Sequence, residues 1–191
     1  MIQEVRLTSQ QMWSVARVTA VIDIVFVAIL IWRIKRTRFR QSLGPLVVVS
    51  AAFWTFTLWL PVWSYWTSCY GYIFPDWVRW ITPIYGLVIG ALLAPLFWWL
   101  GVRLPGHPVL TVAILGGLHS LPGHMHGIYG RDMLEKCPLL VDVSAASALV
   151  FGVFEFIFYW CVVLTLTALI VSMREHWRRR RREGTMPAHR T

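Results

Sequence analysis

The stretch "PVLTVAILGGLHSLPGHMH", residues 108–126, decides how many times this chain crosses a membrane. Its apolar part, residues 108–121, is too short to cross comfortably, because a membrane-spanning helix needs about 20 predominantly apolar residues. The stretch comes close to that length only if it includes His119, His124 and His126. Whether these histidines lie in the membrane, at its edge or in water therefore depends on whether the stretch crosses.

The composition of the whole chain is that of an integral membrane protein. Of its 191 residues, 57% are hydrophobic, only 14% are charged, and 12 are tryptophan. Soluble domains are far less apolar and less aromatic than this. Four further apolar stretches are long enough to be spans, namely residues 13–32, 44–66, 80–101 and 144–173. The last is longer than a span needs, so its inner end is predicted to project from the membrane as helix.

The basic residues predict both the orientation and the number of spans. Five of them follow the first span within residues 33–40, and seven lie in residues 174–191. Loops rich in Lys and Arg stay in the cytoplasm, so both blocks are predicted to be cytoplasmic. They can share a side only if an even number of crossings separates them, which requires residues 108–126 to cross.

The predicted fold is therefore an all-α integral membrane protein with a single bundle of five transmembrane helices in residues 1–173. Its N-terminus is outside, and residues 174–191 form a basic cytoplasmic tail. This predicts a multi-pass protein of the cell membrane whose partners are the lipid bilayer and, at the tail, anionic lipid headgroups. The net charge of +9 follows from this topology, and no nucleic-acid-binding motif accompanies it, so no nucleic-acid partner is predicted.

Three ionisable residues inside the predicted spans are the candidate site, because such residues are costly in a bilayer and usually face the bundle interior. Asp23 lies ten residues beyond Trp13, roughly 15 Å deep at 1.5 Å per residue. Glu155 lies at a similar depth from the same face, and His119 is shallower. We expect Asp23, His119 and Glu155 to face one polar pocket in the outer half of the membrane.

Three interpretations of these polar residues stay open. They could hold helices together by hydrogen bonds to neighbouring spans. They could bind a transition metal ion such as copper, zinc or iron, with His119, His124 and His126 as ligands. They could carry acid–base or proton chemistry, with Asp23 and Glu155 as the catalytic carboxyl groups.

Two local features bear on the histidines and on packing. Pro122 and Gly123 are expected to kink or end the helix, which would let the three histidines converge. Gly86 and Gly90 are four residues apart and predict a face for close helix approach, either within the chain or between subunits.

The three cysteines fall into different compartments. Cys69 and Cys137 lie in the two predicted outer loops, where an oxidising compartment permits a disulfide, and Cys161 lies in the final span. Two alternatives remain open for the outer pair, a disulfide bond or two free thiols.

Three classes of function remain. The favoured one is a non-catalytic membrane protein, either a subunit with partner membrane subunits or a binder of a small apolar ligand, because no catalytic motif accompanies the polar residues. The alternatives are a membrane-embedded metalloenzyme or acid–base enzyme, and a small transporter or proton pathway.

Overall fold

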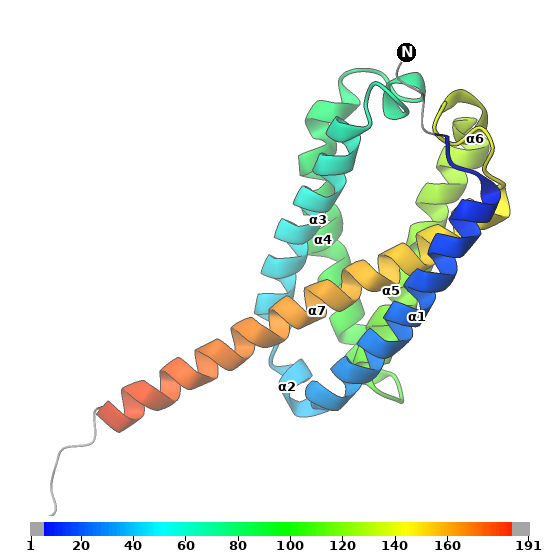
Figure 1. The fold of residues 1–191 in the computed structure, drawn as a ribbon. Helices are drawn as coiled ribbons and strands as arrows, with labels where there is room; N and C mark the ends of the chain where they lie inside the picture. The colour runs from blue at the N-terminus through cyan, green and yellow to red at the C-terminus, as the bar shows by residue number, and fades with distance from the viewer. Residues whose placement is uncertain (1–5, 185–191) are drawn as a thin grey trace, which may run out of the picture.

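The computed structural model describes residues 6–184 as a bundle of helices (Figure 1). In chain order these are α1 (Ser9–Arg33), α2 (Arg36–Arg40), α3 (Leu43–Ser64), η1 (Tyr70–Tyr72), α4 (Val78–Arg103), α5 (Pro108–Met125), η2 (His126–Gly130), α6 (Met133–Lys136) and α7 (Ala145–Gly184). Four of them, α1, α3, α4 and α7, are long and apolar enough to cross a membrane. They coincide with the four clear span predictions and indicate a multi-pass membrane protein.

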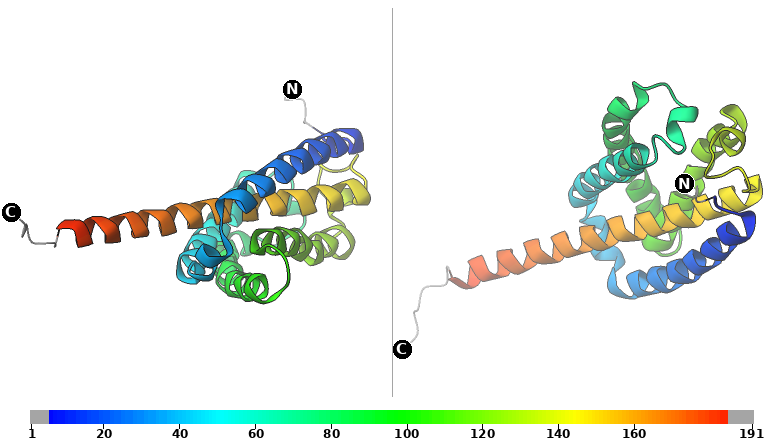
Figure 2. Two further views of the ribbon diagram at one scale, coloured as in Figure 1. Left: turned by 90° about the horizontal axis from the view of Figure 1, so that it is seen from below. Right: turned by 45° about the horizontal axis from the view of Figure 1, so that its top comes forward.

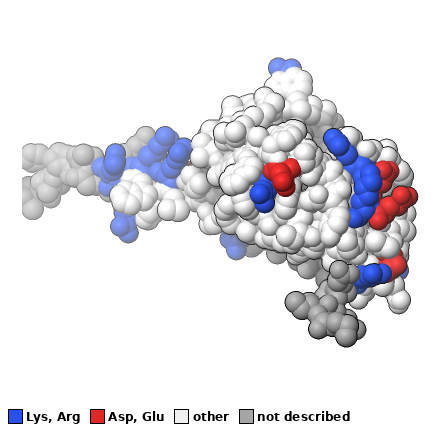
Figure 3. Space-filling view, turned by 90° about the horizontal axis from the view of Figure 1, so that it is seen from above, with Lys and Arg blue, Asp and Glu red and all other residues white. Residues whose placement is uncertain are grey.

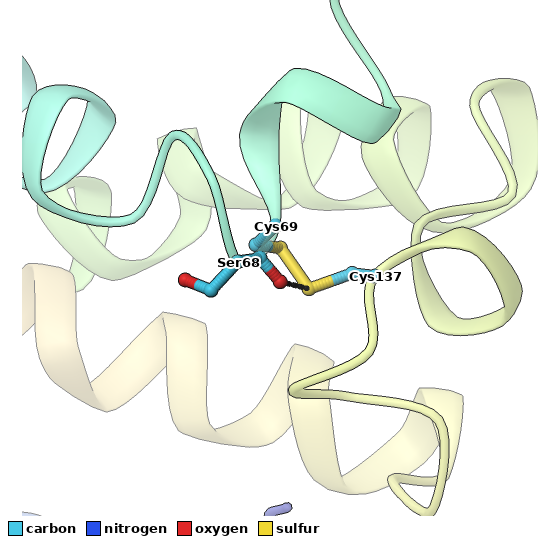
Figure 4. The surroundings of a disulfide bond; sticks show 3 residues. All are labelled: Ser68, Cys69 and Cys137. Atoms are coloured by element: carbon cyan, nitrogen blue, oxygen red, sulfur yellow. Dashed lines mark hydrogen bonds between the residues drawn. A yellow bond between two sulfur atoms is a disulfide. The ribbon is translucent and has the colours of Figure 1, made fainter. Parts of the chain in front are cut away.

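The bundle has two ends that differ in chemistry. At one end, a disulfide with an S–S distance of 2.05 Å joins Cys69, before η1, to Cys137, after α6 (Figure 4). We call this the disulfide end. The bond confirms the first alternative for Cys69 and Cys137, a disulfide, and Cys161 is free and buried. The opposite end, which we call the basic end, holds α2 and the loop between α4 and α5 (Figure 1).

Helix α5 is the segment whose crossing was in doubt, and it is not among the four helices that are both long and apolar enough to cross a membrane. It starts at the basic end, where the imidazole Nδ1 of His107 accepts a hydrogen bond from the backbone N–H of Val109 at 3.3 Å. It then packs against α4 and α7 and ends near the disulfide end (Figure 1). At 1.5 Å per residue its 18 residues extend over about 27 Å, close to the thickness of a hydrocarbon core.

Of the two effects expected of Pro122 and Gly123, a kink or a helix end, the end does not occur, and α5 nearly matches the bounds of the predicted span, residues 108–126. The α-helix continues through Pro122 to Met125 and then widens into the π-helical turn η2. A proline removes one backbone donor, but ending the helix inside an apolar bundle would leave several backbone groups unpaired. The π turn gives the chain an extra residue in one turn near the proline, a known way to accommodate local irregularity in a helix.

Hydrogen bonds fasten the chain at both ends of the bundle. At the disulfide end, the backbone N–H of Ser9 donates to the carbonyl of Asp142 at 3.0 Å, and the N–H of Ser144 donates to Ser9 Oγ at 2.7 Å. This places the start of α1 beside the start of α7. At the basic end, the guanidinium of Arg36 donates to carbonyls that end α4 and begin the next loop, namely those of Val102, Leu104 and Gly106. A basic side chain therefore satisfies carbonyls that the helix itself leaves unpaired.

Close approach of α3 and α4 explains the paired glycines. Gly86 lies against the backbone of Trp54 and Thr55, and Gly90 lies against Ala51. A side chain on either glycine would collide with backbone atoms, so these two positions set the distance between the helices. The predicted face therefore packs within one chain.

The long helix α7 crosses the whole bundle and continues beyond it (Figure 2). Its first part packs against α1, α3 and α5, and its end projects past the basic end, as the length of residues 144–173 predicts. Figure 3 shows basic side chains gathered on this projection. Residues 185–191 of the predicted tail lie outside the described part of the chain.

Candidate functional site

Glu155 of α7 lies at the centre of a polar group in the half of the bundle nearer the disulfide end. Its carboxylate accepts a hydrogen bond of 2.5 Å from the hydroxyl of Tyr159, one helical turn along. His124 of α5 and Tyr70 of η1 are close enough to interact electrostatically with this carboxylate. Burial first, and then the negative charge of Glu155, raise the pKa of Tyr70 to about 12. Three elements therefore converge on one carboxyl group.

His124 links this group to the rest of α5. Its Nδ1 lies 2.9 Å from the carbonyl oxygen of Ser120, and its ring packs against Gly152 and Phe156 of α7. Because Nδ1 faces a carbonyl oxygen, Nδ1 is the nitrogen that donates this hydrogen bond.

His119 lies in an aromatic box rather than beside a carboxylate. Four rings, those of Trp54, Phe97, Phe156 and Trp160, lie with their centroids between 5.2 and 6.1 Å from that of the imidazole. The Nδ1 atom is 2.6 Å from the carbonyl oxygen of Gly116. His119 and His124 are close enough to influence each other electrostatically. The box is the packed centre of the bundle.

The third histidine lies apart from the other two. His126 is exposed at the start of η2, and its Nε2 accepts a hydrogen bond of 3.4 Å from Nε of Arg131. In the part of the chain whose side chains are described, no group of three or more His, Cys, Asp or Glu side chains is arranged to hold a metal ion. The arrangement of the histidines therefore gives the metal hypothesis no support.

Asp23 is buried at the interface of α1 with α7, where its electrostatic neighbour is Cys161. Its side chain is 3% exposed, and neither carboxylate oxygen has a hydrogen-bond partner among the described residues. Glu155 therefore lies near His124, Tyr159 and Tyr70, whereas Asp23 lies near Cys161.

A separate groove lies between α1, α2 and α7 toward the basic end, and we call it the α1–α7 groove. Its volume is about 370 Å³, within the range of small-molecule sites. None of Asp23, His119 and Glu155 lines it. Its lining includes Phe26, Leu30, Arg33 and Arg38 from α1 and α2, and Thr165 and Ala168 from α7.

The groove is apolar along its length and charged at one end. The hydroxyls of Ser42, Thr165 and Thr167 all donate to backbone carbonyls of their own segments, at 2.7, 2.8 and 2.7 Å. They therefore offer a ligand little hydrogen-bonding capacity. The charges are two guanidinium groups: that of Arg38 pairs with Glu175 at 3.6 Å, and that of Arg33 stacks on the Trp32 ring at 4.5 Å.

Sequence reasoning missed the groove and two other features. Arg33 and Arg38 stand out in the sequence as topology signals, but the faces of α1 and α7 that meet carry no clear periodic pattern. Tyr159 is separated from Glu155 by four residues, a spacing that could have indicated the hydrogen bond. Arg79 was also missed: its guanidinium lies between 5.2 and 5.5 Å from the ring centroids of three tryptophans, Trp63, Trp66 and Trp80.

Comparison of the chain with known protein families, with curated protein sequences and with solved structures finds no match.

Proposed function

We propose that this chain is a non-catalytic membrane protein that binds a small amphipathic molecule in the α1–α7 groove. The observation that carries the proposal is the groove itself, a space of about 370 Å³ with apolar walls and charge at one end. Ligand sites in helical bundles are typically of this kind, mostly apolar with a few polar groups that fix the orientation.

The proposal includes five crossings, with the N-terminus outside the cell membrane and the C-terminus in the cytoplasm. Two features support it. Helix α5 extends from the basic end to the disulfide end, and the chemistry of the two ends differs as the two sides of a cell membrane do. Disulfides form in oxidising compartments, and Lys and Arg gather on the cytoplasmic side. In this orientation the groove opens toward the cytoplasmic leaflet.

Filling the groove tests the binding proposal. Ala168 lines the groove from α7, so Ala168→Phe should occupy part of the space and lower ligand retention. Ala28 of α1 is exposed and does not line the groove, so Ala28→Phe is a control with the same added volume. Native mass spectrometry of protein purified in mild detergent measures the retained molecules.

We expect the wild-type and Ala28→Phe proteins to retain a lipid-like ligand and the Ala168→Phe protein to lose most of it. Equal retention by the two variants, or no bound molecule on the wild-type protein, would reject ligand binding in the groove.

A second candidate function, acid–base or proton chemistry, rests on the group around Glu155. The proposal is supported by the hydrogen bond of 2.5 Å from Tyr159 to Glu155 and by the proximity of His124, so three titratable side chains lie close together. General acid–base chemistry needs such groups within hydrogen-bond reach of one another or of a substrate. Proton uptake by the protein in liposomes, compared between wild type and Glu155→Gln, tests it; equal uptake rejects this second function.

A further inference from the structure

The α1–α7 groove has an orientation, because its charge lies at one end only. Along α1, it extends from Phe26 to Arg33, a distance of about 10 Å at 1.5 Å per residue. The wall is made of aromatic and aliphatic side chains, with Phe26 at the deep end, Leu30 between and Ile34 near the mouth. A molecule that fits this groove, which is apolar at the deep end and charged at the mouth, has a hydrocarbon part at the deep end and a polar group at the mouth.

The charge at the mouth specifies the polar group. Arg33 and Arg38 both line the groove, and the lining residues include no Asp or Glu. Guanidinium groups bind phosphate oxygens through paired hydrogen bonds, and they do so best when no carboxylate satisfies them first. Among the side chains that the structure describes, no carboxylate forms an ion pair with Arg33, and the Arg33 guanidinium lies over Trp32.

A phosphate that binds Arg38 has to compete with the carboxylate of Glu175. Its carboxylate lies 3.6 Å from the guanidinium, and the two side chains are 32% and 48% exposed. Ion pairs between such exposed groups are weak, typically about 0–1 kcal/mol, so a phosphate can displace the carboxylate. The pair joins α2 to α7 beside the groove, so an incoming anionic head meets it directly.

We propose that the α1–α7 groove holds an anionic phospholipid, with its phosphate between Arg33 and Arg38 and one acyl chain along Phe26 and Leu30. The phosphate takes the place of Glu175 on Arg38. This inference rests on the proposed function, because it names the ligand of the same groove. Its source is the leaflet on the side of the basic end, where Arg178 and the following arginines of α7 raise the local concentration of anionic lipid.

The test uses the full-length protein in lipid nanodiscs that contain phosphatidylglycerol and phosphatidylcholine with identical chains. In each of two samples, one of the two lipids carries a diazirine in its acyl chain, and cross-linked peptides are identified by mass spectrometry. We expect phosphatidylglycerol to label the groove segments of α1 and α7 several-fold more than phosphatidylcholine. Loss of one arginine should lower this preference about fivefold, the effect of one basic residue near an anionic surface.

Three variants sharpen the test. Arg38→Gln should lose the preference, whereas Arg103→Gln should keep it, because Arg103 lies at the same end of the bundle but stacks on Trp99 and does not line the groove. Glu175→Gln should increase labelling by phosphatidylglycerol, a gain that a poorly folded protein would not produce.

The outcomes separate this inference from the proposed function. Equal labelling of the groove by both lipids would overturn the anionic ligand and leave groove binding intact. Equal losses in Arg38→Gln and Arg103→Gln, or no gain in Glu175→Gln, would also overturn it. Absence of cross-links in the groove with either lipid would overturn both.

Discussion

Replacing Gly90 by alanine should destabilise the bundle, because it adds a methyl group where α3 and α4 lie closest. A Cβ atom at this position would be 2.6 Å from Cα of Ala51 and 2.7 Å from the carbonyl oxygen of Ser50. Carbon atoms in contact are normally about 3.5–4.0 Å apart, so the helices must separate locally by about 1 Å. Both obstacles are backbone atoms, which cannot rotate away as a side chain can.

The expected magnitude combines two opposing terms. Overpacking of this kind costs about 1–3 kcal/mol. Alanine also forms helix better than glycine, by up to about 1 kcal/mol, which offsets part of the cost. We therefore expect Gly90→Ala to lower the free energy of unfolding by about 1–2 kcal/mol. Gly123 is a matched control, because it is also inside a helix and has no atom within 4 Å of its Cβ position.

The assay is unfolding by sodium dodecyl sulfate in mixed micelles, followed by far-ultraviolet circular dichroism. Gly123→Ala should be neutral or slightly stabilising. The double variant Gly86→Ala, Gly90→Ala should cost less than the sum of the two single changes, because the first methyl group already separates the helices at both positions. A Gly90→Ala protein as stable as Gly123→Ala would show that α3 and α4 do not pack at this distance.

Three further predictions use the same unfolding assay. Asp23→Leu should raise the free energy of unfolding by about 1–3 kcal/mol, because it removes a buried carboxylate without hydrogen-bond partners; a loss of stability would contradict this. Tyr159→Phe should lower it by about 1–3 kcal/mol by removing the donor to the Glu155 carboxylate, and an unchanged midpoint would disprove that contribution. Burial, followed by the charge of Arg36, lowers the pKa of His107 below its ordinary value of 6.5. The unfolded chain therefore binds a proton at His107 more readily than the folded protein does, and the free energy of unfolding should fall as the pH drops below about 6.5. His107→Asn keeps a helix-capping side chain without this titration and should reduce the fall; an unchanged pH profile would refute it.

The spans could be predicted from the sequence because a bilayer imposes a length and a composition on any helix that crosses it. The four long apolar stretches could be predicted for this reason. The glycine pair of α4 could be predicted because small residues four apart allow two helices to approach closely. The pairing of Cys69 with Cys137 could be proposed but not decided, since it depended on two loops meeting at one end of the bundle. The sequence left open whether Pro122 kinks or ends the helix, because the local effect of a proline does not include the cost of unpaired backbone in an apolar bundle.

The candidate site was harder to predict than the fold. Depth along a helix can be counted from the sequence, but depth says nothing of the direction in which a side chain points around the helix. Glu155 meets His124 and Tyr159, whereas Asp23 meets Cys161 on another face of α7. The groove depends on how α1, α2 and α7 meet. The spanning parts of α1 and α7 carry apolar residues on all sides, so no periodicity shows which of their faces are in contact.

Whether α5 crosses the membrane tests the proposed topology most directly, because a crossing puts the disulfide outside the cell and the groove on the cytoplasmic side. Single cysteines at two exposed positions, Leu104 before α5 and Tyr129 after it, can be labelled with a membrane-impermeant maleimide in intact cells. The background is Cys161→Ser, since Cys69 and Cys137 are bonded to each other. We predict that Tyr129→Cys is labelled in intact cells and Leu104→Cys only after the membrane is permeabilised. Labelling of both positions from the same side would contradict the five-span arrangement and the location of the groove.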